Sequence, residues 1–325
     1  MKRRALRGVF LGLLLSAAAA CIALRSGKSE QKQTLSFPTM GTVATLTFYT
    51  DTKTFAGVVK AIREDLAEVS AVANLHNPSS ELARLNKEAA QKPFLCSNAI
   101  WEILTEARLA YRLSEGAFDI SITPLMTHWG FYRKRAQLPA PSETEKIKAL
   151  TGLDRILFDD SKRSVKFPAP GFALDLGGIA KGYAIEKAYK TAVKHGISRG
   201  VIDLGGNLRL MPLPPPGEKY YKIGIRRPDR KKKGVMPEVL LLRGDLAVSS
   251  SGDYERFVKI SGKKFGHIMD PATGFPASVD RAVTAVSDSG IRSDWLSTAV
   301  YLRGKKLAEK LEKQLNNTRF VIIKK

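Results

Sequence analysis

The sequence predicts an α+β fold with antiparallel-rich sheets and flanking helices. Amphipathic helical periodicity dominates the first half of the chain, whereas short β-prone stretches dominate after residue 155. A block of helices followed by a block of strands favours this class over the regular alternation of a doubly wound sheet. The chain has 325 residues, of which 44% are hydrophobic, and it shows no internal repeat, so it can form one large or two modest domains.

The early helices follow from apolar spacing and from capping residues. Residues 54–75 place apolar side chains at the i, i+3, i+4, i+7 positions of an amphipathic helix. Cap residues indicate three further helices: one after Ser79-Ser80, one opened by Asn98 that ends at Leu113, and one that a capping box at 142–145 opens and that runs through Leu150.

The strands follow from short runs of β-branched and aromatic residues bounded by turns. A turn at 38–41 precedes a strand at 43–49, and residues 155–158 and 164–167 are typical of a hairpin. Further strands are expected at 172–176, 200–204, 207–211, 221–225, 239–242, 246–249, 283–286 and 319–323, with helices at 291–302 and 305–315 before the last strand.

A strand–glycine–helix unit at 172–196 organises the centre of the chain. Two glycines interrupt an apolar strand at 172–176, and a helical period follows up to Gly196, where a helix C-cap favours a left-handed residue. Such a turn leaves backbone N–H groups free at a helix N-terminus, which makes it suitable for binding an anion. The glycine spacing matches neither a P-loop nor a dinucleotide fingerprint.

The N-terminus predicts export. Residues 1–20 combine a basic start with a short apolar run and small residues, which is the pattern of a signal peptide. Cys21 follows two alanines and looks like the lipidated cysteine of a bacterial lipoprotein, while the polar residues 21–34 would form a tether. Plain cleavage near Ala20 is the alternative, because Ala18 stands where such sites usually carry leucine. We expect a membrane-anchored protein of the cell envelope on the periplasmic or extracytoplasmic side.

Cysteine usage and charge limit the possible partners. With Cys21 as an anchor, Cys96 stands alone and no internal disulfide can form. The net charge of +22 is compatible with an anionic membrane surface, an anionic ligand, nucleic acid or merely solvated basic loops. An exported chain has little access to nucleic acid, so we expect no nucleic-acid partner.

Several polar segments fit neither surface nor core patterning, and most of them are flanked by glycine. They lie at 39–42, 116–119, 172–196, 205–207, 249–256 together with 267–271, and 294–298. In this order they resemble the ApbE family, the FAD:protein FMN transferases, over residues 35 to 315. The resemblance implies an ApbE-like architecture related to the T-fold, in which residues 35–325 form the flavin transferase domain or two subdomains with FAD between them.

The family's reaction splits the pyrophosphate of FAD, moves FMN onto a threonine or serine hydroxyl of an acceptor protein and releases AMP. A pyrophosphate favours a hard cation with oxygen ligands, usually Mg²⁺. Asp294 and Thr298 are four residues apart at the start of a helix, so their oxygens face one side. By the resemblance they bind Mg²⁺ together with the backbone carbonyl of Ala180, and Ser297 lies close enough to assist. The alternative is that Asp294 only caps its helix.

The resemblance also assigns residues to the two ends of FAD. Met40 would lie against the flavin, and Ala117, Phe118 and Asp119 match the FAD-binding segment at the adenosine end, where Asp119 would accept hydrogen bonds. The family usually has an aromatic residue at the position of His76, where this chain offers an imidazole for stacking. Without the resemblance, a methionine after a turn is more often a core residue.

The central unit and the segment at 267–271 complete the expected site. Gly177 and Gly178 let a ligand approach the backbone closely, and Lys181 and Tyr183 on the first helical turn can reach phosphate or adenine. The hydroxyls of 249–256 would support the phosphates and the acceptor. His267 resembles the family's histidine in this segment and is the candidate base for the acceptor proton, because imidazole titrates near neutrality.

Ile268, next to that histidine, is assigned to the cofactor pocket by the same resemblance. A structural His267 hydrogen-bonded to Asp270 is the alternative to a base. The acceptor implied by the export signal is a redox protein of the cell envelope with an exposed threonine or serine. Two other functions use a similar pocket: an FAD pyrophosphatase that gives FMN and AMP, and a flavin-binding lipoprotein without turnover. A role in thiamine biosynthesis fits an exported chain poorly.

Overall fold

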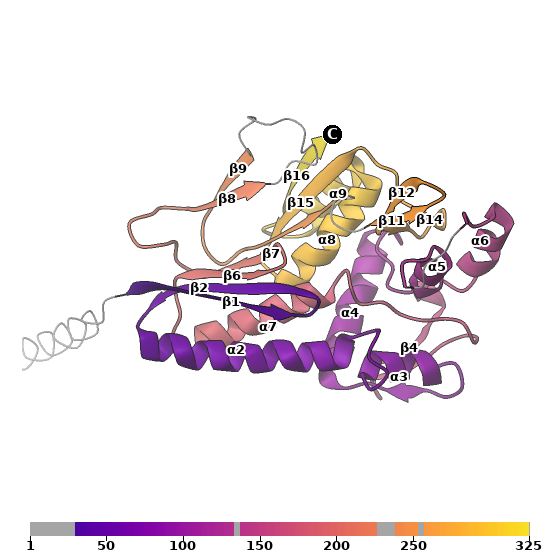
Figure 1. Ribbon diagram of the computed structural model, residues 1–325, viewed down its shortest axis with the longest axis horizontal. Helices are drawn as coiled ribbons and strands as arrows, with labels where there is room; N and C mark the ends of the chain where they lie inside the picture. The colour runs from indigo at the N-terminus through magenta and orange to yellow at the C-terminus, as the bar shows by residue number, and fades with distance from the viewer. Residues whose placement is uncertain (1–29, 133–136, 226–237, 253–256, 325) are drawn as a thin grey trace, which may run out of the picture.

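The computed structural model describes residues 30–132, 137–225, 238–252 and 257–324. The expected signal peptide and Cys21 lie outside the described residues. The fold is α+β: a long sheet runs through the molecule, and helices pack along it (Figure 1). In the described part of the chain, no helix has both the length and the apolarity needed to cross a membrane.

The main sheet has seven strands, and each neighbouring pair is antiparallel. In spatial order they are β1 (Gln31–Thr39), β2 (Thr42–Thr50), β6 (Gly200–Leu204), β7 (Asn207–Leu210), β10 (Ala247–Ser251), β15 (Arg281–Ser287) and β16 (Arg319–Lys324). The β1–β2 and β6–β7 hairpins therefore place their turns at the same end of the sheet, since Ala44 of β2 is opposite Leu204 of β6.

The helices follow the apolar pattern of the sequence. They are α2 (Thr52–Ala73), α3 (Glu81–Glu88), α4 (Asn98–Leu113), α5 (Thr123–His128), α6 (Pro141–Lys148), α7 (Ala180–Lys194), α8 (Gly290–Arg303) and α9 (Lys305–Gln314), with a 3₁₀ turn at Leu153–Arg155. Helix α2 buries Val58, Val59, Ile62, Leu66 and Val69, which is the stripe that its periodicity predicts. It lies beside α7 under the β1–β2 hairpin (Figure 1).

Four small sheets surround this framework. They pair β3 (Phe94–Leu95) and β4 (Leu157–Asp159) with β5 (Ser164–Lys166), β8 (Tyr221–Ile225) with β9 (Glu238–Leu242), β11 (Phe257–Ile260) with β12 (Lys263–Gly266), and β13 (Met269–Asp270) with β14 (Phe275–Pro276). The β8–β9 hairpin projects from the sheet at the upper left of Figure 1. The β11–β14 hairpins lie near α5 and α6 on the opposite side of the molecule.

The core consists of three clusters of buried apolar residues. One cluster fills the space between α2, α7 and the β1–β2–β6 part of the sheet, and a larger one joins α4 and α8 to the small β3–β5 sheet. A third, built around Trp129 and Met269, holds α5 against the β11–β14 hairpins. Met40 and Tyr183 pack against both of the first two clusters, so they lie where these two clusters meet.

Three expectations about elements are wrong. The first strand begins at Gln31, so residues 31–34, assigned to the tether, belong to the sheet. Residues 172–176 are extended but join no ladder. Instead, the side chain of Asn86 donates to the Leu174 carbonyl at 2.9 Å and accepts from its N–H at 2.7 Å. Helix α6 starts at Pro141, before the expected capping box, because proline suits the first helical position. It ends at Lys148, before the expected end at Leu150.

Candidate active site

The site is organised by a close contact between α7 and α8, which two glycines make possible. A Cβ atom on Gly182 would lie 2.5 Å from the Gly290 carbonyl oxygen and 2.6 Å from the Asp294 Cβ. Because neither residue has a side chain at the crossing, the two helix backbones touch. The Gly182 N–H can then donate to the Asp294 Oδ2 at 2.9 Å. The helix contact therefore places a carboxylate of α8 at the N-terminal turn of α7.

Asp294 is a buried carboxylate next to the ammonium group of a lysine. Its side chain is 7% exposed, and the Lys181 Nζ lies 3.8 Å from its Oδ1. The same ammonium group donates to the Gly177 carbonyl at 3.3 Å. Helix α8 begins at Gly290 and is capped by Ser289, whose side chain accepts from the Arg292 N–H. The reading of Asp294 as a mere helix cap is therefore wrong.

Hydroxyl groups from a neighbouring strand extend this cluster. Ser251, at the end of β10, lies with its Oγ 2.8 Å from the Ser297 Oγ and 3.1 Å from the Thr298 Oγ1. The Ser297 hydroxyl also donates to the Asp294 carbonyl at 2.9 Å. Ala180 is the first residue of α7, two residues before the N–H that reaches Asp294. The structure thus brings Ser251 into contact with Ser297 and Thr298 on the helix that carries Asp294, and the expected contact of the Ala180 carbonyl with a metal remains a prediction.

The donor set fits a hard cation. The hydroxyls of Ser251, Ser297 and Thr298 lie together, and the Asp294 carboxylate is carried one helical turn before Thr298. Mg²⁺ favours such oxygen ligands, and a single carboxylate leaves room for waters and substrate phosphates. Within the described ranges, no three histidine, cysteine or acidic side chains form a metal-binding group.

The Gly177–Gly178 turn packs against the segment expected to bind adenosine. A Cβ on Gly178 would lie 3.0 Å from the Phe118 ring, so only glycine fits without moving the ring. Phe118 and Ala117 are both buried, and the Phe118 ring lies 6.3 Å from that of Trp295 on α8. The Gly177–Gly178 turn therefore packs against Phe118, and Phe118 lies next to Trp295 on α8, the helix that carries Asp294.

Asp119 is buried, and its carboxylate accepts hydrogen bonds from Ser121 and from the backbone of Leu153. Its Oδ1 accepts hydrogen bonds from the N–H and the hydroxyl of Ser121, both at 2.7 Å. Burial raises the pKa of Asp119 above its ordinary value, although the bonds from Ser121 oppose this shift. The carboxylate thus shapes the 117–121 loop, and its expected contact with FAD remains a prediction.

The two hairpin turns at the end of the main sheet carry unusual backbone. Met40 has φ +48° and Gly41 φ +69°, which is the left-handed pair that a two-residue hairpin turn requires. Methionine rarely adopts this conformation, and such residues concentrate at functional sites. Gly205 in the neighbouring turn approaches so closely that a Cβ would lie 2.4 Å from the Thr42 Oγ1. The two turns therefore pack against each other.

Tyr183 and Ile268 of the 267–271 segment form hydrogen bonds within the protein. The Tyr183 hydroxyl donates to Glu102 of α4 at 2.8 Å, and burial followed by the Glu102 contact raises its pKa. The hydroxyl is therefore directed to α4, and its expected contact with phosphate or adenine remains a prediction. His267 directly follows β12, and Ile268 is buried with its carbonyl accepting from the Ala277 N–H at 2.7 Å.

His76 contacts an aromatic residue that the sequence did not single out. Its ring lies 5.2 Å from that of Tyr132, at an interplanar angle of 71°. Tyr132 donates its hydroxyl hydrogen bond to Asp175, whose other oxygen accepts from the Gly177 N–H at 2.7 Å. Sequence reasoning missed Tyr132 and Asp175, because contacts between such distant residues leave no local pattern.

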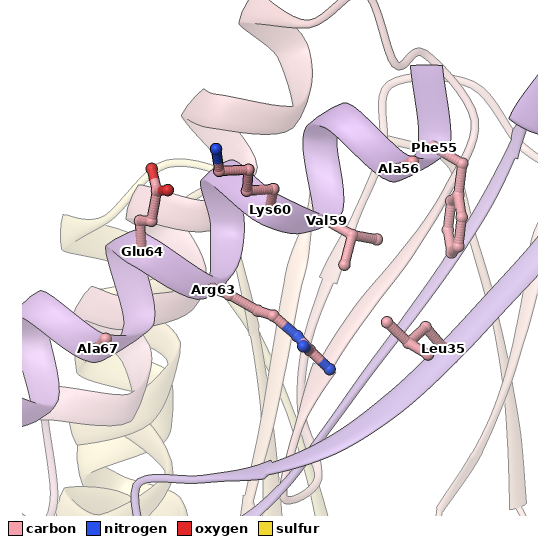
Figure 2. A pocket seen from close by; sticks show the side chains of 8 residues that line it. All are labelled: Leu35, Phe55, Ala56, Val59, Lys60, Arg63, Glu64 and Ala67. Carbon is pink, nitrogen blue, oxygen red and sulfur yellow. The ribbon is translucent and has the colours of Figure 1, made fainter. Parts of the chain in front are cut away.

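An open groove of about 640 Å³ lies elsewhere, between β1 and the outer side of α2 (Figure 2). Figure 2 shows Leu35 and Phe55 at one end and the polar side chains of Lys60, Arg63 and Glu64 along the helix. The groove contains none of the expected site residues. Its size is therefore no argument for placing the chemistry there.

Comparison with known proteins gives a consistent result. The sequence model of the ApbE family matches residues 40–322. An FAD:protein FMN transferase from Vibrio cholerae is 29% identical over 286 residues, which cover 85% of this chain and 83% of that protein. One from Haemophilus influenzae is 27% identical over 318 residues, covering 95% and 91%.

Solved structures share the fold along nearly the whole chain. The ApbE protein of Thermotoga maritima superposes with a TM-score of 0.82 at 27% identity, covering 90% of this chain and 94% of that one. The flavin transferase ApbE from Vibrio cholerae gives 0.79 at 28% identity, covering 91% and 94%. Together with the family match over residues 40–322, these likenesses establish that the chain belongs to the ApbE family.

Proposed function

We propose that this protein transfers FMN from FAD to a threonine or serine hydroxyl of an acceptor protein and releases AMP. The proposal is supported by family membership and by relatives named FAD:protein FMN transferase. The observation that carries it is the gathering of Lys181, Asp294 and the hydroxyls of Ser251 and Thr298 beside the Gly177–Gly178 turn. A pyrophosphate needs such a combination of cationic and metal-binding groups.

Mg²⁺ is the proposed cofactor, held by Asp294, Thr298 and the carbonyl of Ala180, with Ser297 in support. When bound, a divalent cation neutralises phosphate charge and assists ionisation of an attacking hydroxyl. The Gly182 N–H keeps the Asp294 carboxylate oriented, because it holds Oδ2 and leaves Oδ1 directed at the Lys181 ammonium. We propose no soft-metal chemistry for the site.

The protein groups would act on one displacement at phosphorus. The acceptor oxygen forms a bond to the flavin-side phosphorus, the bond from that phosphorus to the bridging oxygen breaks, and AMP leaves with that oxygen. Lys181 is placed to stabilise negative charge on the phosphates, which is usually the largest contribution to such catalysis. His267 would take the acceptor proton. Met40 and the 117–119 segment would hold the flavin and adenosine ends.

The test is incubation of the purified protein with FAD, Mg²⁺ and candidate envelope acceptors. We expect a fluorescent acceptor band and a mass increase equal to one FMN on a threonine or serine. AMP should appear in the same amount as the modified acceptor. If FMN and AMP accumulate at full rate while every acceptor stays unmodified, the enzyme is an FAD pyrophosphatase and the transferase proposal is wrong.

We also propose that the protein works in the cell envelope, anchored through lipid on Cys21. The proposal is supported by the basic and apolar pattern of residues 1–20 and by the small residues before the cysteine. FAD outside the cytoplasm is retained only when it is fixed to a protein, so an exported flavin transferase has an evident use. The acceptor would be an envelope redox protein with an exposed hydroxyl-bearing segment.

A further inference from the structure

The resemblance assigns His76 to the cofactor pocket, where its imidazole would stack on a planar ring of FAD. In the structure the imidazole is not alone, because the Tyr132 ring lies edge-on to it with centroids 5.2 Å apart. Tyr132 is half-buried, so part of it remains accessible. An aromatic ring from a different segment of the chain therefore lies beside the imidazole.

Tyr132 is connected to the phosphate side of the site by a short hydrogen-bonded path. Its hydroxyl donates to one carboxylate oxygen of Asp175, and the other accepts from the Gly177 N–H at 2.7 Å. Gly177 in turn offers its carbonyl to Lys181 at 3.3 Å. A displacement of the tyrosine would therefore shift the Gly177 turn, which lies beside the Lys181–Asp294 pair.

The hydroxyl of Tyr132 acts as a donor and not as a base. Burial, followed by the nearby Asp175 carboxylate, raises the pKa of this phenol, so it stays protonated at neutral pH. A neutral phenol that is fixed by a carboxylate has one orientation, which favours a flat, immobile ring surface. Such a ring binds planar ligands at little entropic cost.

We propose that Tyr132 supplies a stacking contact to a planar ring of FAD beside His76, and that Asp175 fixes its orientation. The inference rests on the proposed function only in taking FAD as the ligand. The ring is either the isoalloxazine or the adenine, since both are flat and the contact chemistry is the same. The structure contributes the geometry: two rings in contact, and a path from one of them to the Gly177 turn.

The first experiment measures binding of FAD, FMN and AMP to the full chain with single variants, using flavin fluorescence and calorimetry. Tyr132→Leu removes the ring and should weaken FAD binding by about 5- to 150-fold, which is the range of aromatic stacking on a base. Tyr132→Phe keeps the ring and should lose much less. A parallel loss for FMN assigns the isoalloxazine, and a parallel loss for AMP assigns the adenine.

The second experiment is a rescue. His76→Tyr places a larger aromatic ring beside the vacated position, so the double variant with Tyr132→Leu should regain most of the lost FAD affinity. A residue that only supports the fold would give no such rescue. Tyr189→Phe is the matched control, because Tyr189 also donates to an aspartate, Asp245, at 2.5 Å, but lies toward the far end of α7. It should bind FAD as the wild type does.

The outcomes separate the two proposals. A wild-type protein that does not bind FAD overturns the proposed function and this inference with it. If the wild type binds FAD but Tyr132→Leu binds it equally well, only the stacking role is wrong. If Tyr132→Leu fails to fold, Tyr132→His takes its place: the smaller imidazole ring should weaken FAD binding while Tyr132→Phe largely keeps it, and equal FAD affinities in these two variants contradict the proposal.

Discussion

At the scale of single residues, Asp294 is the side chain on which most depends. Asp294→Ala should abolish FAD cleavage, because it removes the only described carboxylate among the proposed metal donors. It also leaves the Gly182 N–H without its acceptor, which costs about 1–3 kcal/mol of folding free energy. Turnover and thermal melting measure the two effects. Asp288→Asn, in the loop just before α8, is the control and should keep full activity; normal turnover in Asp294→Ala would contradict the assignment.

His267 is expected to accelerate the reaction without being indispensable. His267→Ala should reduce transfer by about 10²–10⁴-fold, which is typical for loss of a general base, and leave a measurable rate. A chelator should stop transfer completely, because the proposed Mg²⁺ would both neutralise phosphate charge and assist ionisation of the attacking hydroxyl. His195→Ala at the C-terminal end of α7 is the control. Equal rates for His267→Ala and the wild type would show that this histidine is structural.

Asp119 makes stability depend on pH. Its pKa in the folded protein lies above the ordinary value of 3.8, so the folded state binds this proton more tightly than the unfolded state. The contribution to stability is present below pH 3.8 and is lost as the pH rises through the folded pKa. Asp119→Asn keeps an acceptor oxygen for Ser121 without the charge. Its melting temperature relative to the wild type should therefore rise between about pH 3 and pH 7; a constant difference would contradict the shift.

Residues of the site were predictable where the family pattern names them, and not where the fold alone brings them together. Asp294 and Thr298 share a helix face, so their proximity follows from spacing. Ser251 is 47 residues before Thr298, and Tyr132 is 43 before Asp175. Only the register of β10 and the path of the chain after α5 bring these pairs into contact, and neither can be read from a sequence window.

At the scale of elements, the α7–α8 crossing controls the site. Gly182→Ala would force a Cβ to within 2.5 Å of the Gly290 carbonyl, and backbone atoms cannot rotate away. We expect a loss of about 1–3 kcal/mol of unfolding free energy, together with lower metal affinity as Asp294 moves. Gly57→Ala in α2, where nothing lies within 4 Å, should stabilise by about 0.4–1 kcal/mol. Denaturant unfolding measures both, and equal effects would contradict the crossing.

Most elements followed from local pattern, and the exceptions have physical causes. The amphipathic stripe of α2 and the left-handed Gly196 after α7 are local signals, and the structure confirms both. Residues 172–176 looked like a strand because they are short and apolar. The backbone of Leu174 is satisfied by the side chain of Asn86, 88 residues earlier, and this amide replaces a neighbouring strand. Strand β1 was not predicted, because the polar residues at its start resemble a tether.

At the scale of the whole molecule, the cellular location of the protein can be tested separately from its catalytic activity. Cys21→Ser should convert a membrane-bound protein into a released one, since lipid on a single cysteine is the proposed anchor. Fractionation of cells that express each form measures this. FAD-dependent transfer by the purified variant should be unchanged, because Cys21 lies before the described residues. Wild-type protein that is itself wholly soluble after export would contradict the lipoprotein proposal.

The proposed site draws on the Met40 turn, on the 117–119 loop, on the start of α7 and on α8, so no continuous piece of the chain would contain it. A ligand bound there recognises only the completely folded molecule, and its binding free energy adds to the stability of the whole chain. At 100 times its dissociation constant, FAD would contribute about 2.7 kcal/mol against global unfolding. For a chain proposed to work in the cell envelope, binding of FAD would therefore stabilise the enzyme only after it has folded there. A molecule in which α8 has not packed against α7 would lack enzymatic activity. It would also fail to bind the ligand that would protect it from envelope proteases.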